Sequence, residues 1–68
     1  MIRIPKDSYT VTGILLKNSL PLRRGDLLHI TRGDFGYLAY DVTQNRYYYI
    51  ESSLIHNENV FQAQEVVR

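Results

Sequence analysis

Turn-forming residues interrupt this chain at short intervals and divide it into short runs. The runs between the turns are rich in Tyr, Val, Ile and Thr, which favour strands. The turn signals are KNS at 17–19, RRGD at 23–26, RGDFG at 32–36, TQNR at 43–46 and HNEN at 56–59. Short strands between evenly spaced turns are typical of a small barrel or sandwich, so we expect an all-β chain.

Side chains that alternate between two faces predict where the strands lie. Strands are expected over residues 9–16, 26–32, 36–42 and 46–51. Between the last two, Asn45 is the residue expected to take the positive φ of a tight hairpin turn.

The segment 60–68 is ambiguous. Phe61 and Ala63 share one side of a strand, whereas Val60, Ala63 and Val67 have helical spacing. A short fifth strand with a terminal extension that turns helical is the preferred interpretation, and the choice between strand and helix stays open.

The chain must be stabilised by one apolar core. It has 68 residues, no cysteine and two histidines, so neither a disulfide nor a zinc site is expected to hold it together. A single domain over residues 1–68, with its core at about 9–64, is therefore predicted. The side chains expected to point inward are Leu20, Leu22, Leu28, Ile30, Ala39, Ile50 and Ile55.

Net charge and hydropathy limit the partners and the cellular location that we expect for this chain. The net charge is +1, which gives no strong field to attract DNA or an anionic membrane. The longest apolar run, GILL, is far shorter than the roughly 20 residues of a membrane span. We therefore expect a cytoplasmic protein with no membrane partner.

The stretch LPLRRGDLLHI at 20–30 resembles the centre of a Src-homology-3 (SH3) domain. In that family an apolar pair leads into a basic-basic-Gly-Asp turn and then a strand with alternating core residues. The later stretch FGYLAYDVTQNRYYYIESSLI is similar to the family's GWWLARN…TGREGYIPSNYV. Over residues 11–55 the resemblance implies an SH3-like barrel of about five short antiparallel strands, with a short 3-10 turn near 52–55.

The same resemblance shows which family features are missing. VTGILL stands where the family has ALYDY, and only KNS remains of the long acidic loop that follows. Gly36, Glu51 and Leu54 occupy the positions of the first Trp, the Pro and the Tyr that grip a proline-rich peptide. We therefore expect the fold to be kept and the usual proline-peptide pocket to be lost.

Tyrosines are the most unusual surface candidates. Residues Tyr47, Tyr48 and Tyr49 are consecutive, so at least one must face away from the core, and Tyr40 is expected to approach Tyr47 or Tyr49 across the hairpin. Together with Tyr37 they form either an amphipathic binding patch or aromatic pairs that stiffen the hairpin. The second interpretation is slightly favoured.

Lys17, Arg23 and Arg24 are expected near the first two turns. They would contact nucleic acid or phosphate, or would simply be solvated, which is the favoured interpretation. Arg-Gly-Asp occurs at 24–26 and 32–34, and turn chemistry explains both copies.

No spacing in the sequence predicts catalytic, metal or cofactor chemistry, since its Ser, His and carboxylate residues are scattered. The leading hypothesis is a non-catalytic protein–protein interaction module that binds a protein partner, or a second copy as a homo-oligomer, through a non-proline surface. The alternatives are a small barrel that binds nucleic acid through Arg, Lys and Tyr, and a purely structural role.

Overall fold

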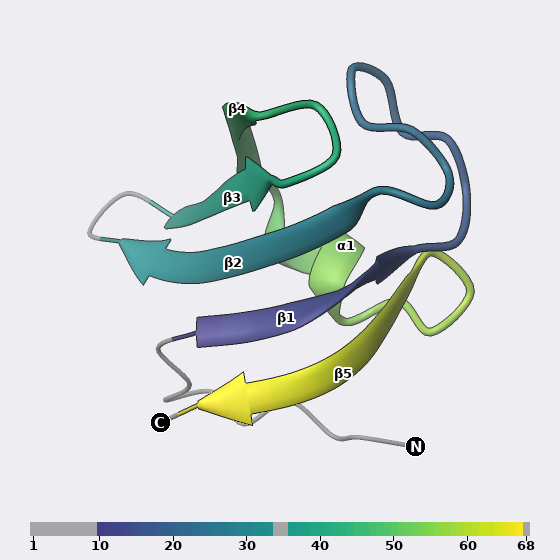
Figure 1. Ribbon diagram of the computed structural model, residues 1–68. Coiled ribbons are helices and arrows are strands. Elements are labelled where there is room, and N and C mark those ends of the chain that lie inside the picture. The colour runs from purple at the N-terminus through teal and green to yellow at the C-terminus, as the bar shows by residue number, and fades with distance from the viewer. Residues whose placement is uncertain (1–9, 34–35, 68) are drawn as a thin grey trace.

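The computed structural model describes residues 10–33 and 36–67, and it is an antiparallel sheet of five strands with one helical turn (Figure 1). The sheet order is β4-β3-β2-β1-β5. The elements are β1 (Thr10–Leu15), β2 (Leu27–Gly33), β3 (Gly36–Asp41), β4 (Arg46–Ile50), α1 (Ser52–Ile55) and β5 (Phe61–Val67). The predicted all-β fold class is confirmed.

The ambiguous C-terminal segment is a strand. β5 pairs antiparallel with β1, from Leu15 opposite Phe61 to Thr10 opposite Val67. Parts of the sequence predictions lie outside the described residues: Tyr9 at the start of the first predicted strand, Asp34 and Phe35 of the RGDFG turn, and residues 1–8 and 68 of the predicted domain.

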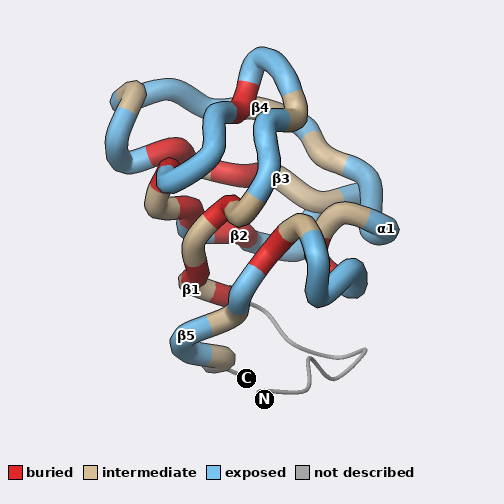
Figure 2. The backbone as a smooth tube through the Cα atoms, turned by 90° about the vertical axis from the view of Figure 1, so that its right-hand side faces the viewer, coloured by how far each residue is buried: buried red, intermediate tan, exposed pale blue. Residues whose placement is uncertain are grey.

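The buried residues come mainly from β1, β2 and β3, where they alternate with more exposed ones (Figure 2). Leu28 and Ile30 of β2 are buried, as their alternation predicts, and Ala39 of β3 is fully enclosed between its neighbours. The whole buried apolar cluster is Val11, Leu15, Leu22, Leu28, Ile30, Ala39, Ile55 and Phe61.

Leu20 is the one wrong prediction among the inward residues, because 81% of its surface is exposed. Ser19 and Leu22 exchange backbone N–H to carbonyl hydrogen bonds in both directions, each 2.9 Å long. Leu20 and Pro21 therefore occupy the tip of a two-residue hairpin, where strand alternation does not apply. Ile50, also predicted to point inward, is only partly buried against the core.

Gly13 allows β1 and β5 to approach closely. A Cβ atom at this position would come within 2.3 Å of the carbonyl oxygen of Gln62 and 2.4 Å of the Phe61 ring. The pairing register shifts between Thr12 and Gly13, so β5 carries one extra residue there as a bulge.

The predicted turns have the expected backbone. Asn45 has φ 57° in the β3–β4 turn, and Gly25 has φ 90° in the turn before β2. The helical turn α1 is closed by the N–H of His56, which donates to the carbonyl of Ser52 at 3.2 Å, an α-type bond where a 3-10 turn was expected. In the described part of the chain no helix is long and apolar enough to cross a membrane.

Candidate interaction groove

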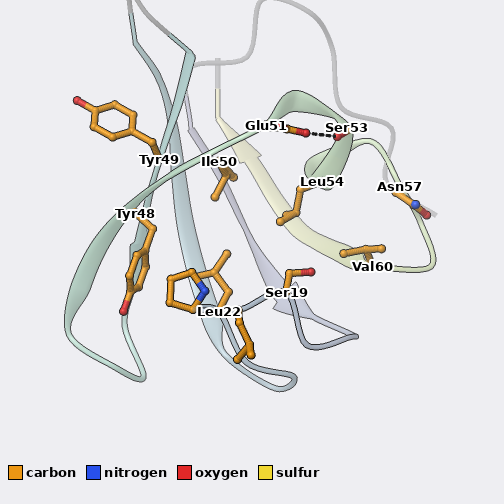
Figure 3. Close-up of a pocket in the computed structure, with 12 residues that line it drawn as sticks. Ser19, Leu22, Tyr48, Tyr49, Ile50, Glu51, Ser53, Leu54, Asn57 and Val60 are labelled. Atoms are coloured by element: carbon orange, nitrogen blue, oxygen red, sulfur yellow. Dashed lines mark hydrogen bonds between the residues drawn. The ribbon is translucent and has the colours of Figure 1, made fainter.

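An open groove of about 430 Å³ lies beside β4, between the Ser19–Leu22 hairpin and α1 (Figure 3). We call it the β4 groove. Its lining is mainly apolar and comes from segments that are far apart in the sequence. The lining residues are Ser19, Leu20, Pro21, Leu22, Tyr48, Tyr49, Ile50, Glu51, Ser53, Leu54, Asn57 and Val60.

The Ser19–Leu22 hairpin holds one wall of this groove. The buried Leu22 anchors the hairpin in the core, so that Leu20 at the tip stays in solvent. The opposite wall includes Leu54 of α1 and Val60, both partly buried against the core. Apolar side chains that are held in place but exposed on one side can contact another apolar surface without rearrangement.

The floor of the groove is formed by β4. Figure 3 shows the rings of Tyr48 and Tyr49 leaving the strand in opposite directions. Tyr48 is half-buried, and its hydroxyl donates to Oε1 of Gln44 at 3.0 Å, whereas Tyr49 is 80% exposed. The one ionisable acid on the lining is Glu51, whose carboxylate accepts a hydrogen bond from Ser53 at 3.4 Å.

Behind the groove lies a buried polar cluster that the sequence analysis did not find. Asp26 is 4% exposed and Asp41 is fully buried, and their carboxyl groups share a hydrogen bond. Nε2 of Gln44 donates to Oδ2 of Asp26 at 2.8 Å and to the carbonyl of Pro21 at 2.9 Å. This side chain therefore ties the β3–β4 turn to the hairpin that carries Leu20.

The two carboxyl groups have opposite pKa shifts. Burial raises the pKa of Asp41, and its hydrogen bond to Asp26 raises it further. Burial also acts to raise the pKa of Asp26, but hydrogen bonds from Asp41, Gln44 and the backbone N–H of Arg23 lower it on balance. When the pair holds one proton, these shifts favour Asp41 as its site, from which it is donated to the Asp26 carboxylate.

The burial of Asp41 could have been predicted from the sequence. Residues 37, 39 and 41 share one face of β3, and Ala39 was already assigned to the core. A carboxylate on a core face requires a partner, and that requirement points to the cluster.

The structure distributes the five candidate tyrosines over more than one surface. Tyr48 and Tyr49 line the β4 groove. The rings of Tyr40 and Tyr47 pair across the hairpin with centroids 4.8 Å apart, as the strand register predicts, and they border a shallow depression together with His29. Tyr37 is half-buried against the core and does not line the groove.

Lys17, Arg23 and Arg24 are exposed on the two turns before β2. The backbone N–H of Arg24 donates to Oδ1 of Asn18 at 2.8 Å, which brings these turns together. The carboxylate of Asp26, in the first Arg-Gly-Asp, is buried and is not presented to solvent. Over residues 10–33 and 36–67 there is no group of three or more His, Cys, Asp or Glu side chains that could hold a metal ion.

Comparisons with protein-family models, with curated proteins and with solved structures give no significant match to this chain. The function therefore has to be argued from the geometry of the groove.

Proposed function

We propose that this chain is a non-catalytic protein-interaction module of SH3-like type, and that the β4 groove binds an apolar segment of a partner protein. The observation that carries the proposal is the exposure of Leu20, on one wall, and of Tyr49, on the strand that forms the floor, at a preformed groove. Large apolar side chains gathered around a groove on a small domain are typical of a binding surface.

The SH3-like part of the proposal rests on the order of the elements. A turn with Gly25 and Asp26 before β2, a tight β3–β4 hairpin, and a helical turn between β4 and β5 occur in the order that the resemblance implies. The short loop between Leu16 and Ser19 also fits an open groove, since there is little chain to overhang it.

The proposed ligand is not a proline-rich peptide. At the positions that carry the family's gripping rings, Gly36 has no side chain and Glu51 offers a carboxylate, while Leu54 offers an aliphatic wall. An aliphatic wall favours Leu, Ile, Val or Phe side chains in the ligand, whereas a polyproline helix is normally held between aromatic rings.

Selection from a library of random peptides, followed by NMR titration of an enriched peptide into isotope-labelled protein, tests the proposal. We expect amide shifts at Leu20, Tyr49 and Leu54, and enriched sequences without the two-proline spacing. Leu20→Asp should weaken binding by about tenfold or more, because a Leu contact is replaced by a charge.

Val42→Asp is the matched control, since Val42 is also an exposed apolar residue but lies outside the groove lining. It should bind like the wild type. Amide shifts confined to another face, or equal effects of the two substitutions, would contradict the proposal.

The nucleic-acid alternative is supported by the hydrogen bond from the Arg24 backbone to Asn18, which holds the turn that carries Lys17 beside the turn that carries Arg23 and Arg24. Titration with single-stranded oligonucleotides at several salt concentrations tests it. We expect salt-sensitive binding that Arg23→Ala and Arg24→Ala weaken, and no binding at low salt would exclude it.

A further inference from the structure

We propose that β4 pairs antiparallel with β4 of a second copy, around a two-fold axis at Tyr48. The inference rests on the proposed function and names the partner at the same surface. It is carried by the hydrogen-bonding direction of the β4 backbone, by the difference between the two edges of the sheet, and by the exposed rings of Tyr47 and Tyr49.

The strand register determines whether the N–H and C=O groups of each β3 residue point toward β2 or toward β4. The N–H of Val42 donates to the carbonyl of Leu27 at 2.9 Å, so these residues form a hydrogen-bonded pair. Bonded and non-bonded pairs alternate along an antiparallel ladder. The next pair is Leu28 with Asp41, so Asp41 directs its N–H and C=O toward β4 and its partner Arg46.

The same alternation continues along β4. Arg46, Tyr48 and Ile50 bond to β3, and Tyr47 and Tyr49 direct their N–H and C=O groups away from it. Since β4 is the last strand in the sheet order, these two donors and two acceptors face the outside of the sheet. They form a short template for another strand.

A second copy of β4 satisfies all of these groups in one register. With Tyr47 opposite Tyr49 of the other copy, and the reverse, the two strands exchange four backbone hydrogen bonds about a two-fold axis. The two Tyr48 residues then face each other as the central non-bonded pair. If the register were shifted by one residue, the outward N–H and C=O groups of Tyr47 and Tyr49 would lie opposite residues of the other copy whose own N–H and C=O groups already bond to β3.

The two edge strands of the sheet differ in how well they are protected against pairing with a further strand. The other edge strand, β5, carries a bulge next to Glu65, and bulges and charges both hinder pairing at an edge. β4 carries no Lys or Pro, and its pairing with β3 runs from Asp41–Arg46 to Tyr37–Ile50 without a shift. β4 is therefore the edge that is open to a further strand.

The exposed tyrosine side chains of the two copies meet in this register. Tyr47 is 66% exposed and Tyr49 still more so, and pairing brings the Tyr47 ring of each copy beside the Tyr49 ring of the other.

The contact is small. A standard stable interface buries about 1,600 Å² in total, and two strands of the length of β4 bury less. We therefore expect a weak dimer that dissociates on dilution.

Sedimentation equilibrium over a wide range of protein concentration measures the association. The mass should rise from the 8.0 kDa of one chain toward that of two. Tyr49→Pro removes an N–H that faces outward and leaves the β3–β4 ladder intact, so it should stay monomeric at every concentration. Tyr49→Val keeps that N–H and loses only the ring, so it should still dimerise, more weakly.

A charge exchange makes the test independent of any effect of proline on folding. Tyr47→Glu with Tyr49→Glu places like charges directly opposite each other and should weaken the dimer about two- to fivefold or more, whereas Tyr47→Lys with Tyr49→Glu places opposite charges there and should restore association. In a mixture of labelled and unlabelled protein, an intermolecular nuclear Overhauser effect between the Tyr48 Hα atoms should appear.

A wild type that stays monomeric, an assembly larger than two chains, or a dimer that survives in folded Tyr49→Pro would overturn the inference. Its failure differs from failure of the proposed function. A monomer that still binds a selected peptide in the groove keeps the interaction module and loses the dimer. A dimer whose dissociated chains bind no library peptide keeps the pairing and loses the peptide site.

Discussion

Single residues in this protein show how strongly a position depends on its neighbours. Asp41 is fully buried, with its pKa raised by burial and by its hydrogen bond to Asp26, and Gly13 leaves space that β5 fills. At both positions a small chemical change has a large expected effect, because nothing nearby can move to accommodate it.

The raised pKa of Asp41 makes stability depend on pH. Between its ordinary value of about 3.9 and its raised value, the folded state holds a proton that the unfolded chain has lost. The unfolding free energy should therefore fall as the pH rises through the pKa of Asp41. The lowered pKa of Asp26 has its effect at acidic pH, where the unfolding free energy falls as the pH drops below the ordinary pKa of an Asp side chain. Urea unfolding at a series of pH values measures the unfolding free energy in both pH ranges.

Asp41→Asn mimics the protonated form and should remove the decline at higher pH. Asp26→Asn is its isosteric control. It removes the charged acceptor of the cluster and should cost about 1–3 kcal/mol of unfolding free energy at neutral pH. Equal effects of the two substitutions would contradict the placement of the proton on Asp41.

Gly13→Ala should destabilise the protein by about 1–3 kcal/mol or more, because the new methyl group overlaps the Gln62 carbonyl and the Phe61 ring. Gly33→Ala is the matched control. The nearest atom to its Cβ would be 3.5 Å away, and Gly33 is exposed, so the change should stay within about 0.5 kcal/mol. Thermal unfolding of the two variants compares them directly, and similar melting temperatures would exclude close packing at Gly13.

At the scale of elements, two tight turns determine the shape of the β4 groove. The Ser19–Leu22 hairpin places one leucine in the core and another in solvent, and the β3–β4 turn reaches back to this hairpin through Gln44. Each turn is formed by residues that are close in the sequence, and the groove forms beside the place where the two turns meet.

The two leucines of the first hairpin should respond differently to the same substitution. Leu22→Ala removes buried side-chain volume and should cost about 2–5 kcal/mol. Leu20→Ala should change the unfolding free energy by no more than about 0.5 kcal/mol, since its side chain is in solvent. Denaturant unfolding measures both, and a large loss in Leu20→Ala would show that the hairpin is placed wrongly.

Gln44→Ala should destabilise the protein by about 1–3 kcal/mol, because Asp26 and the Pro21 carbonyl lose their shared donor. It should also increase the exchange rate of the Leu22 amide by loosening the hairpin. Val42→Ala in the same turn is the control and should stay within about 0.5 kcal/mol. If both variants are equally stable, the Gln44 link does not contribute.

At the scale of the whole molecule, the sheet has three strands with two neighbours and two strands with one. Among the described strands, β4 and β5 each have one side without a neighbouring strand, and such a side can pair with a further strand. The β4 groove borders one of these edges, so side-chain contacts and backbone pairing are available at the same place.

Hydrogen exchange in dilute solution tests this description. Amides of Ile30 and Ala39, in strands paired on both sides, should exchange slowest. Along β4 the rates should alternate, with Tyr48 protected by β3, and Tyr47 and Tyr49 fast. Uniform protection over residues 46–50 in the monomer would refute the backbone directions derived above.

Local chemistry by itself determined the first four strands of this protein and the turn between β3 and β4. Alternation predicted Leu28, Ile30 and Ala39 as core, and turn chemistry predicted the positive φ of Asn45, because both depend only on neighbouring residues. The C-terminal strand stayed ambiguous, since a short apolar run fits either period until a partner strand is present.

Only the tertiary structure decided the exposure of Leu20, the burial of Asp41 with Gln44 as its link, and the β4 groove. Each of these depends on which distant segments meet. A hairpin tip interrupts the alternation that would have buried Leu20, and a buried carboxylate becomes stable only when its partner arrives from another turn. The groove exists because four separate segments end beside one another, and that arrangement is a property of the fold as a whole.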